Sequence, residues 1–113
     1  MAKYETYLRA NVESVVTAIQ DGIPASSVSA KLEDWSDFEL GDCRCAVRVF
    51  ERYSALGGNR VSLSVTVFAR GDDVRLSAIT SGGSQAVFFK VNTIGEANFL
   101  KCLEEIVAQF PTG

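Results

Sequence analysis

Histidine is absent from this 113-residue sequence, which also contains only two prolines, one tryptophan and one methionine. Without histidine the chain cannot form a Ser-His-Asp or Cys-His catalytic group, or any metal site that needs an imidazole. No segment approaches the roughly 20 apolar residues of a membrane span, and the N-terminus lacks the apolar core of a signal peptide. We therefore expect a cytoplasmic protein that uses neither metal nor cofactor and does not associate with membranes.

Cysteine is also scarce, and its count of three is odd. A chain of this size can bury a core without disulfides, so we expect free thiols. Cys43 and Cys45 have one residue between them, which differs from the two-residue spacing of redox and zinc motifs. On a strand both would point to one face and pack as small apolar residues. Whether they have a redox role stays open.

Charge is unevenly distributed along the chain. The net charge is −3, but residues 43–90 contain seven basic and three acidic residues while both flanks are acidic. The overall sign and size disfavour a general nucleic-acid-binding protein.

Hydrophobic periodicity predicts the secondary structure. Alternating apolar residues predict strands over 4–8, 28–32, 43–53, 60–70, 74–78 and 85–91. A helix is predicted from the N-cap Asn11 to a stop at Gly22 and Pro24, and a second from Thr93 to Phe110. Asp34 to Asp37 is predicted to be a turn or short loop, and Gly71 to Asp73 and Ser81 to Ser84 are predicted hairpin turns.

This order predicts a single α+β domain over residues 1–113. Short turns between strands favour an antiparallel meander, and two one-sided helices need one sheet face to cover, which gives a two-layer sandwich. The β-α-β(4-5)-α plan resembles TATA-binding-protein-like and helix-grip folds. That analogy of topology implies no function by itself.

The sheet face left open by the helices is the candidate binding surface. If Val61, Leu63 and Val65 face the helices, Phe68 must face away, and the same argument applies to the neighbouring strands. The predicted binding face comprises Arg44, Arg48, Phe50, Arg52, Phe68, Arg75, Phe88 and Lys90. Interleaved bases and rings can bind a single-stranded nucleic acid or another polyanion. Alternatively, the arginines pair with acids of residues 33–42 or with Glu51, and the phenylalanines form a dimer contact.

Two further features are candidate recognition elements. Thr80, Ser81, Gly82, Gly83, Ser84 and Gln85 could form a backbone nest for an anion, although the P-loop lysine is missing and a plain hairpin turn is the alternative. Trp35 is either a recognition aromatic or a cap on one end of the core. The paired acids are predicted to be solvated, so no residue is assigned a catalytic role.

Several segments carry a family resemblance: residues 32–38, Gly41 to Tyr53, Gly57 to Leu63 and Leu76 to Ala86. Together they resemble a small uncharacterised bacterial family, a domain of unknown function, over nearly the whole chain. The resemblance implies a bacterial cytosolic single domain and transfers no site.

The leading hypothesis is a non-enzymatic binding or protein-interaction module that presents the open sheet face to a partner or to a second copy. The alternative is a small-molecule carrier with a helix-grip-like cavity between helices and sheet. Ligand, partner, oligomeric state and strand order are not determined by the sequence.

Overall fold

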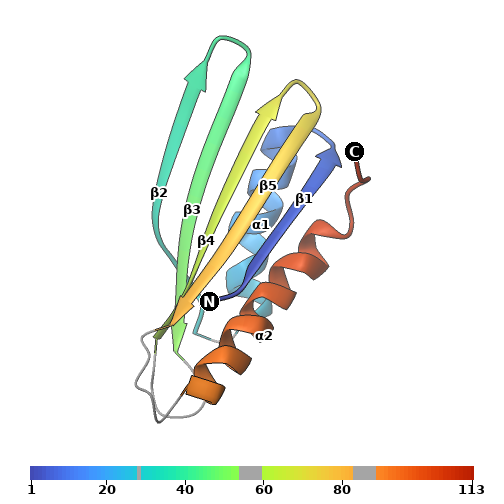
Figure 1. Cartoon of the computed structure of the whole chain (residues 1–113). Helices are drawn as coiled ribbons and strands as arrows, with labels where there is room; N and C mark the ends of the chain where they lie inside the picture. The colour runs from blue at the N-terminus through green and yellow to red at the C-terminus, as the bar shows by residue number, and fades with distance from the viewer. Residues whose placement is uncertain (28, 54–59, 83–88) are drawn as a thin grey trace.

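A computed structural model describes residues 1–27, 29–53, 60–82 and 89–113, with side chains of 89–97 outside the description. The elements in chain order are β1 (Lys3–Arg9), α1 (Val12–Ser26), β2 (Lys31–Leu40), β3 (Cys43–Tyr53), β4 (Arg60–Arg70), β5 (Asp73–Gly82) and α2 (Phe89–Val107). The predicted α+β class, antiparallel sheet and two helices are confirmed (Figure 1). No helix in the described ranges has the length and apolarity needed to cross a membrane.

The five strands form one antiparallel sheet in the order β1-β5-β4-β3-β2. Gly41-Asp42 and Gly71-Asp72 close the β2–β3 and β4–β5 hairpins, and both glycines have φ near +60°. A positive φ at the first central residue is the requirement of a type II′ turn, which glycine meets without strain. These turns fix the register of both hairpins.

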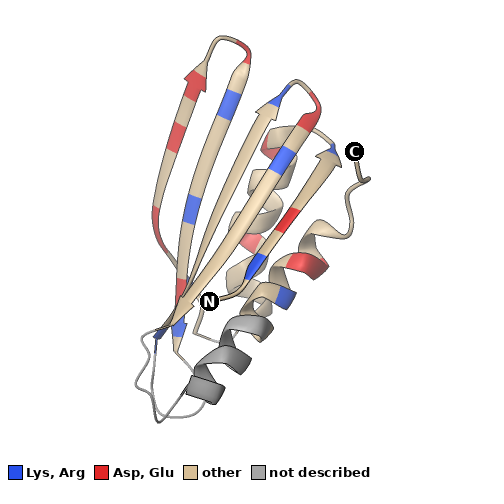
Figure 2. Ribbon diagram, in the orientation of Figure 1, with Lys and Arg blue, Asp and Glu red and all other residues tan. Residues whose placement is uncertain are grey.

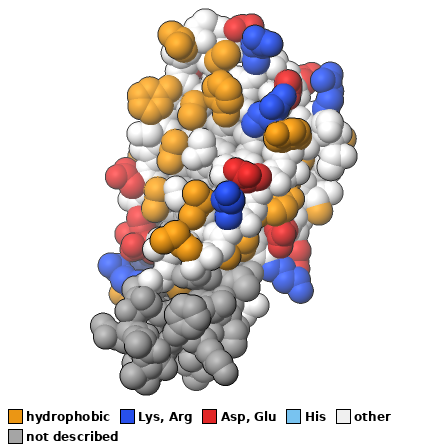
Figure 3. Space-filling model, viewed as in Figure 1, with side chains coloured by type: hydrophobic (Ala, Val, Ile, Leu, Met, Phe, Trp, Pro, Cys, Tyr) orange, Lys and Arg blue, Asp and Glu red, His pale blue; other side chains and the backbone are white. Residues whose placement is uncertain are grey.

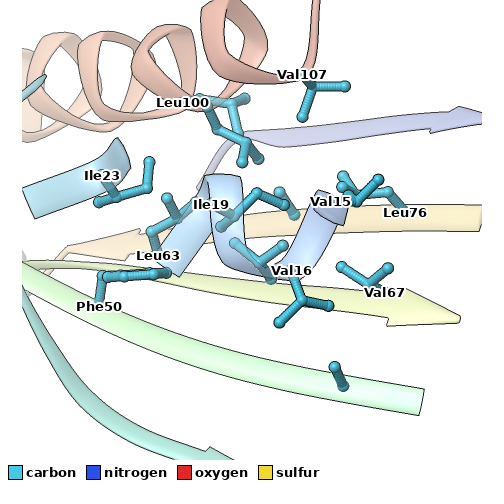
Figure 4. Close-up of a cluster of buried hydrophobic side chains, with 14 of the residues drawn as sticks. Val15, Val16, Ile19, Ile23, Phe50, Leu63, Val67, Leu76, Leu100 and Val107 are labelled. Carbon is cyan, nitrogen blue, oxygen red and sulfur yellow. The ribbon is translucent and has the colours of Figure 1, made fainter. Parts of the chain in front are cut away.

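Both helices pack on the same face of the sheet (Figure 1). α1 lies against β2, β3 and β4, while α2 lies against β1, β4 and β5 and also contacts α1. The Asn11 side chain caps α1 by accepting a hydrogen bond from the Ser14 amide at 3.0 Å. Val15, Val16 and Ile19 of α1 pack over the sheet in the buried apolar core (Figure 4). Burial of this apolar stripe fixes the helix on the sheet.

The predicted stop of α1 at Gly22 and Pro24 is wrong, because the helix continues to Ser26. Gly22 instead faces α2, where an added Cβ would lie 2.8 Å from Cδ1 of Ile106. Its missing side chain therefore permits close approach of the two helices.

Two predicted boundaries near the sheet are also wrong. Residues 34–37 are not a loop, because β2 runs unbroken through Trp35 with one register shift between Leu32 and Asp34. Residues 89–91 are helical rather than extended, since α2 already begins at Phe89. The rest of the predicted strand over 85–91 and the Ser84 end of the predicted hairpin lie outside the described residues.

The two edges of the sheet differ. At the β1 edge, Pro111 O accepts from the Arg9 amide at 2.9 Å, and the Gly113 amide donates to Tyr7 O at 2.9 Å. The C-terminal residues thus cover part of β1, and the chain end lies beside it (Figure 1). At the opposite edge, no segment within the described ranges pairs with the outer side of β2.

Candidate functional site

The sheet face opposite the helices carries a row of large side chains that crosses all five strands. Strand register aligns Tyr7 of β1, Arg75 of β5, Phe68 of β4, Cys45 of β3 and Phe38 of β2. Tyr7, Phe68 and Phe38 are 56%, 49% and 64% exposed. Figure 3, viewed on this face, shows hydrophobic side chains gathered near the hairpin turns. We call the row from Tyr7 to Phe38 the aromatic row.

Arg75 connects the first half of the aromatic row. Its guanidinium lies 4.3 Å from the centre of the Tyr7 ring, and its Nε is 3.2 Å from Oδ1 of Asp73. The hydrogen bond to Asp73 raises the pKa of Arg75 further above its already high value. A surface depression of about 610 Å³ lies here, with Tyr7, Phe68 and Arg75 among its lining residues. A fixed cation and two exposed rings thus border a shallow hollow.

Neighbouring rows place charges of both signs around these rings. Arg9 and Asp73 align with Arg70 toward the hairpin turns, and on the other side Glu5 aligns with Ser77. The open face is therefore mixed in charge rather than uniformly basic (Figure 2).

The predicted orientation of β3 is wrong: Arg44, Arg48, Phe50 and Arg52 lie on the helix side. Their strand partners Ala69, Val65, Leu63 and Val61 are all buried under the helices. Phe50 itself is fully buried, and Figure 4 shows it beside Leu63 in the core. The open side of β3, with Cys43, Cys45, Val47 and Val49, is the more apolar side, so alternation together with the arginine charges predicted the wrong side as the core side.

Arg44 and Arg48 reach acids and amides around the rim of α1. Arg44 Nε is 2.7 Å from Glu13 Oε2, and its Nη1 is 2.8 Å from Asp37 Oδ1. Arg48, with a side chain only 8% exposed, donates to Asp37 Oδ1 at 3.0 Å and to Gln20 Oε1 at 2.9 Å. These hydrogen bonds hold the pKa of Glu13 and Asp37 below the usual range, and they raise the pKa of Arg44. Pairing with the acid of residue 37 confirms the alternative in which these arginines are structural.

Arg52 is held at the other end of β3. Its Nη1 donates to Ser27 Oγ at 2.6 Å, and its guanidinium carbon lies 4.6 Å from the Phe99 ring centre. Burial lowers the pKa of Arg52. Glu51, on the open side of β3, pairs with Arg60 at 3.4 Å, as the cross-strand alternative predicted. The β3 arginines therefore link the sheet to the helical layer.

The other predicted site residues are dispersed. Phe68 and Arg75 do lie on the open face, but Lys90 belongs to helix α2 and cannot extend a strand. Thr80 is a buried residue of β5, not part of a loop, and its hydroxyl accepts from the Ala2 amide at 3.0 Å. Ser81 and Gly82 complete β5. Phe88, Gly83, Ser84 and Gln85 lie outside the described residues.

The structure also decides between the two roles predicted for Trp35 and exposes aromatic residues that the predicted binding face left out. Trp35 is 58% exposed on β2 and does not cap the core. Tyr7 was detectable, because it lies on the polar side of an alternating strand. Phe38 was missed because residues 34–37, which precede it, were predicted to be a loop rather than part of a strand. The three cysteines are half-buried free thiols, as predicted.

Comparison with known proteins gives a family but no activity. No curated protein sequence matches this chain. A crystal structure, of TTHA0849 from Thermus thermophilus, is similar with 15% sequence identity and a TM-score of 0.40, over 96% of this chain and 97% of that one. The model of a family described as "Family of unknown function (DUF6054)" matches residues 1–111. The chain therefore belongs to this family of unknown function.

Proposed function

We propose that this protein is a non-enzymatic interaction module that binds a second copy of itself through the open sheet face. The observation that carries the proposal is the aromatic row, in which Tyr7, Phe68 and Phe38 are each about half exposed or more. Exposed aromatic side chains in one contiguous row are typical of a surface that another protein covers.

The size of the open face supports a protein partner. Strands spaced about 4.8 Å apart, with a rise of about 3.3 Å per residue, give a five-stranded face of roughly 600 to 800 Å². A stable interface buries about 800 Å² per partner. A face of this size is sufficient for a dimer.

The charge pattern supports a second copy as the occupant. Around the rings, Arg9, Arg70 and Arg75 alternate with Glu5 and Asp73. A surface with both signs can be complementary to itself after a two-fold rotation, because a base of one copy can meet an acid of the other. The acids weaken the attraction of this face for a polyanion.

Sedimentation equilibrium and native mass spectrometry test the proposal on three proteins. We expect the wild type to be dimeric and Phe68→Ser to raise the dissociation constant at least about tenfold, since one buried ring contributes about 1.5–3 kcal/mol. Trp35→Ser is the matched control, because it also removes a half-exposed ring but on the helix side of β2. A monomeric wild type, or equal weakening by both substitutions, would refute the proposal.

The carrier alternative depends on the finer helix-grip-like assignment of the fold. Its support is the arrangement itself, a five-stranded antiparallel sheet with two helices on one face. Against it, apolar side chains such as Phe50, Leu63 and Ile19 fill the described space between the layers. The same mass spectra distinguish the two, since a carrier would be a monomer with a reproducible extra mass.

A further inference from the structure

β2 has an edge whose backbone is available for another strand. Leu40 and Cys43 flank a two-residue turn and so form a hydrogen-bonded pair, and such pairs alternate along an antiparallel ladder. Trp35, Asp37 and Glu39 therefore direct their amide and carbonyl groups away from β3. On β1 the same alternation directs the Tyr7 carbonyl and the Arg9 amide outward, and these are the groups that hydrogen-bond to the C-terminal residues. Within the described ranges β2 has no equivalent partner.

One outward amide is already satisfied by a side chain. The Trp35 amide donates to Asp34 Oδ1 at 2.8 Å, a contact between adjacent residues that replaces a ladder bond. The carbonyl of an incoming strand can accept from this amide instead, and the released Asp34 carboxylate, which lies on the open side, is then solvated. The edge is therefore protected in isolation yet can exchange partners.

Both sides of the edge present apolar side chains to an incoming strand. Trp35 is 58% exposed on the helix side, while Phe38 and Leu40 are 64% and 84% exposed on the open side. α1 covers little of β2, since most residues of this strand are exposed. Long exposed apolar edges are where proteins add a strand from a partner.

The charge around the edge selects the partner. β2 contains four acids and one lysine (Figure 2). On its helix side a hollow of about 610 Å³ is lined by Glu13, Asp37, Glu39 and Arg44, and Arg48 also pairs with Asp37, so three acids outnumber two bases. Arg44 keeps the pKa of Glu13 and Asp37 low, so both stay ionised. Two β2 edges facing each other would juxtapose these acids, which disfavours a second copy here.

We propose that β2 binds an extended, basic segment of a partner protein by antiparallel strand addition. Residues of that segment opposite Trp35, Asp37 and Glu39 point to the helix side, where Lys or Arg side chains enter the acidic hollow. Alternate residues are apolar and lie beside Phe38 and Leu40. This surface shares Phe38 with the aromatic row but depends on the backbone edge and the helix side of β2, so it does not require the dimer.

A synthetic peptide as long as β2, 10 residues of alternating Lys and Val, is the probe. Trp35, the single tryptophan, reports binding by a blue shift of its emission as the new strand covers it. We expect saturable binding that weakens with added salt, and no binding of the peptide in which Glu replaces Lys. Failure of the Lys-Val peptide to bind would overturn the proposal.

Backbone pairing is tested separately from charge. In antiparallel addition the amides of the Lys residues face β2, so methylating these nitrogens should weaken binding about tenfold or more. Methylating the Val nitrogens keeps the charge and should leave binding intact. If both methylated peptides bind like the parent, attraction is only electrostatic and strand addition is refuted.

Two variants of Glu39 separate the contribution of charge from that of backbone pairing in the protein itself. Glu39→Gln removes a charge of the hollow and should weaken binding about threefold at low salt. Glu39→Pro removes the charge and an outward amide, so it should weaken binding further. Equal affinity of these two variants would contradict backbone pairing at Glu39. A concentration-dependent blue shift without peptide would assign the edge to a second copy and also overturn the proposal.

Discussion

Replacement of Arg48 by alanine tests the orientation of β3. The Arg48 side chain is 8% exposed and donates to Asp37, to Gln20 and to the carbonyls of Ser36 and Val47, between 2.9 and 3.3 Å. Removing it leaves partly buried acceptors without a donor and opens space under α1. If the sheet were oriented the other way, Arg48 would be a surface residue with little effect on stability.

The magnitude follows from the contacts. Losing a hydrogen-bonded buried cation commonly costs about 3–5 kcal/mol, but Asp37 is 41% exposed and regains water, so we expect about 2 kcal/mol. In a domain of this size that corresponds to a fall in Tm of about 8 °C. Arg75→Ala is the control, because Arg75 is half exposed on the open face and its removal should change the free energy of unfolding only slightly.

Urea unfolding followed by circular dichroism measures both variants. Dimerisation would stabilise the folded state with increasing concentration, so the comparison is made at several protein concentrations. An Arg48→Ala variant that loses no more stability than Arg75→Ala would refute the placement of Arg48 between α1 and β3.

The remaining predictions concern the contact between the two helices, the ion pairs of Asp37 and the β1 edge that the C-terminal residues cover. Gly22→Ala should gain helix propensity of up to about 1 kcal/mol only when Ile106 is also shortened to Ala, because the added Cβ otherwise lies 2.8 Å from Ile106 Cδ1. Thermal unfolding of the two single variants and the double variant measures this coupling. If Gly22→Ala has the same effect with Ile106 and with Ala at position 106, the close contact is contradicted. Because the pKa of Asp37 is lowered in the folded state, the contribution of this carboxylate to the free energy of unfolding is present above its ordinary pKa and is lost as pH falls through the lowered pKa. Tm of the wild type should therefore drop more steeply below about pH 4 than Tm of Asp37→Asn. Parallel curves of Tm against pH would argue against the ion pairs. Deleting residues 111–113 should accelerate hydrogen exchange of the Arg9 amide, which donates to residue 111, and unchanged exchange would mean that the C-terminus does not protect β1.

Local pattern determined most of the secondary structure and the fold class. Val61, Leu63 and Val65 alternate with polar residues, and one apolar side of β4 can only be the core side when helices cover a single face. The Gly71-Asp72 turn likewise follows from a local requirement for positive φ. These features need no distant partner, which is why the sequence alone predicted them.

Tertiary structure decided what the local pattern could not. The more apolar side of β3 is the open side, and the side with the arginines faces the helices because Glu13 and Gln20 of α1 accept hydrogen bonds from Arg44 and Arg48 at the rim. Gly22 has the local signature of a helix end, yet contact with α2 makes it an interior residue of α1. The position of β2 at an edge follows from strand order, a non-local property. Orientation, helix contact and edge exposure arise between segments far apart in the chain, so only the folded structure determined which side chains form the candidate surfaces.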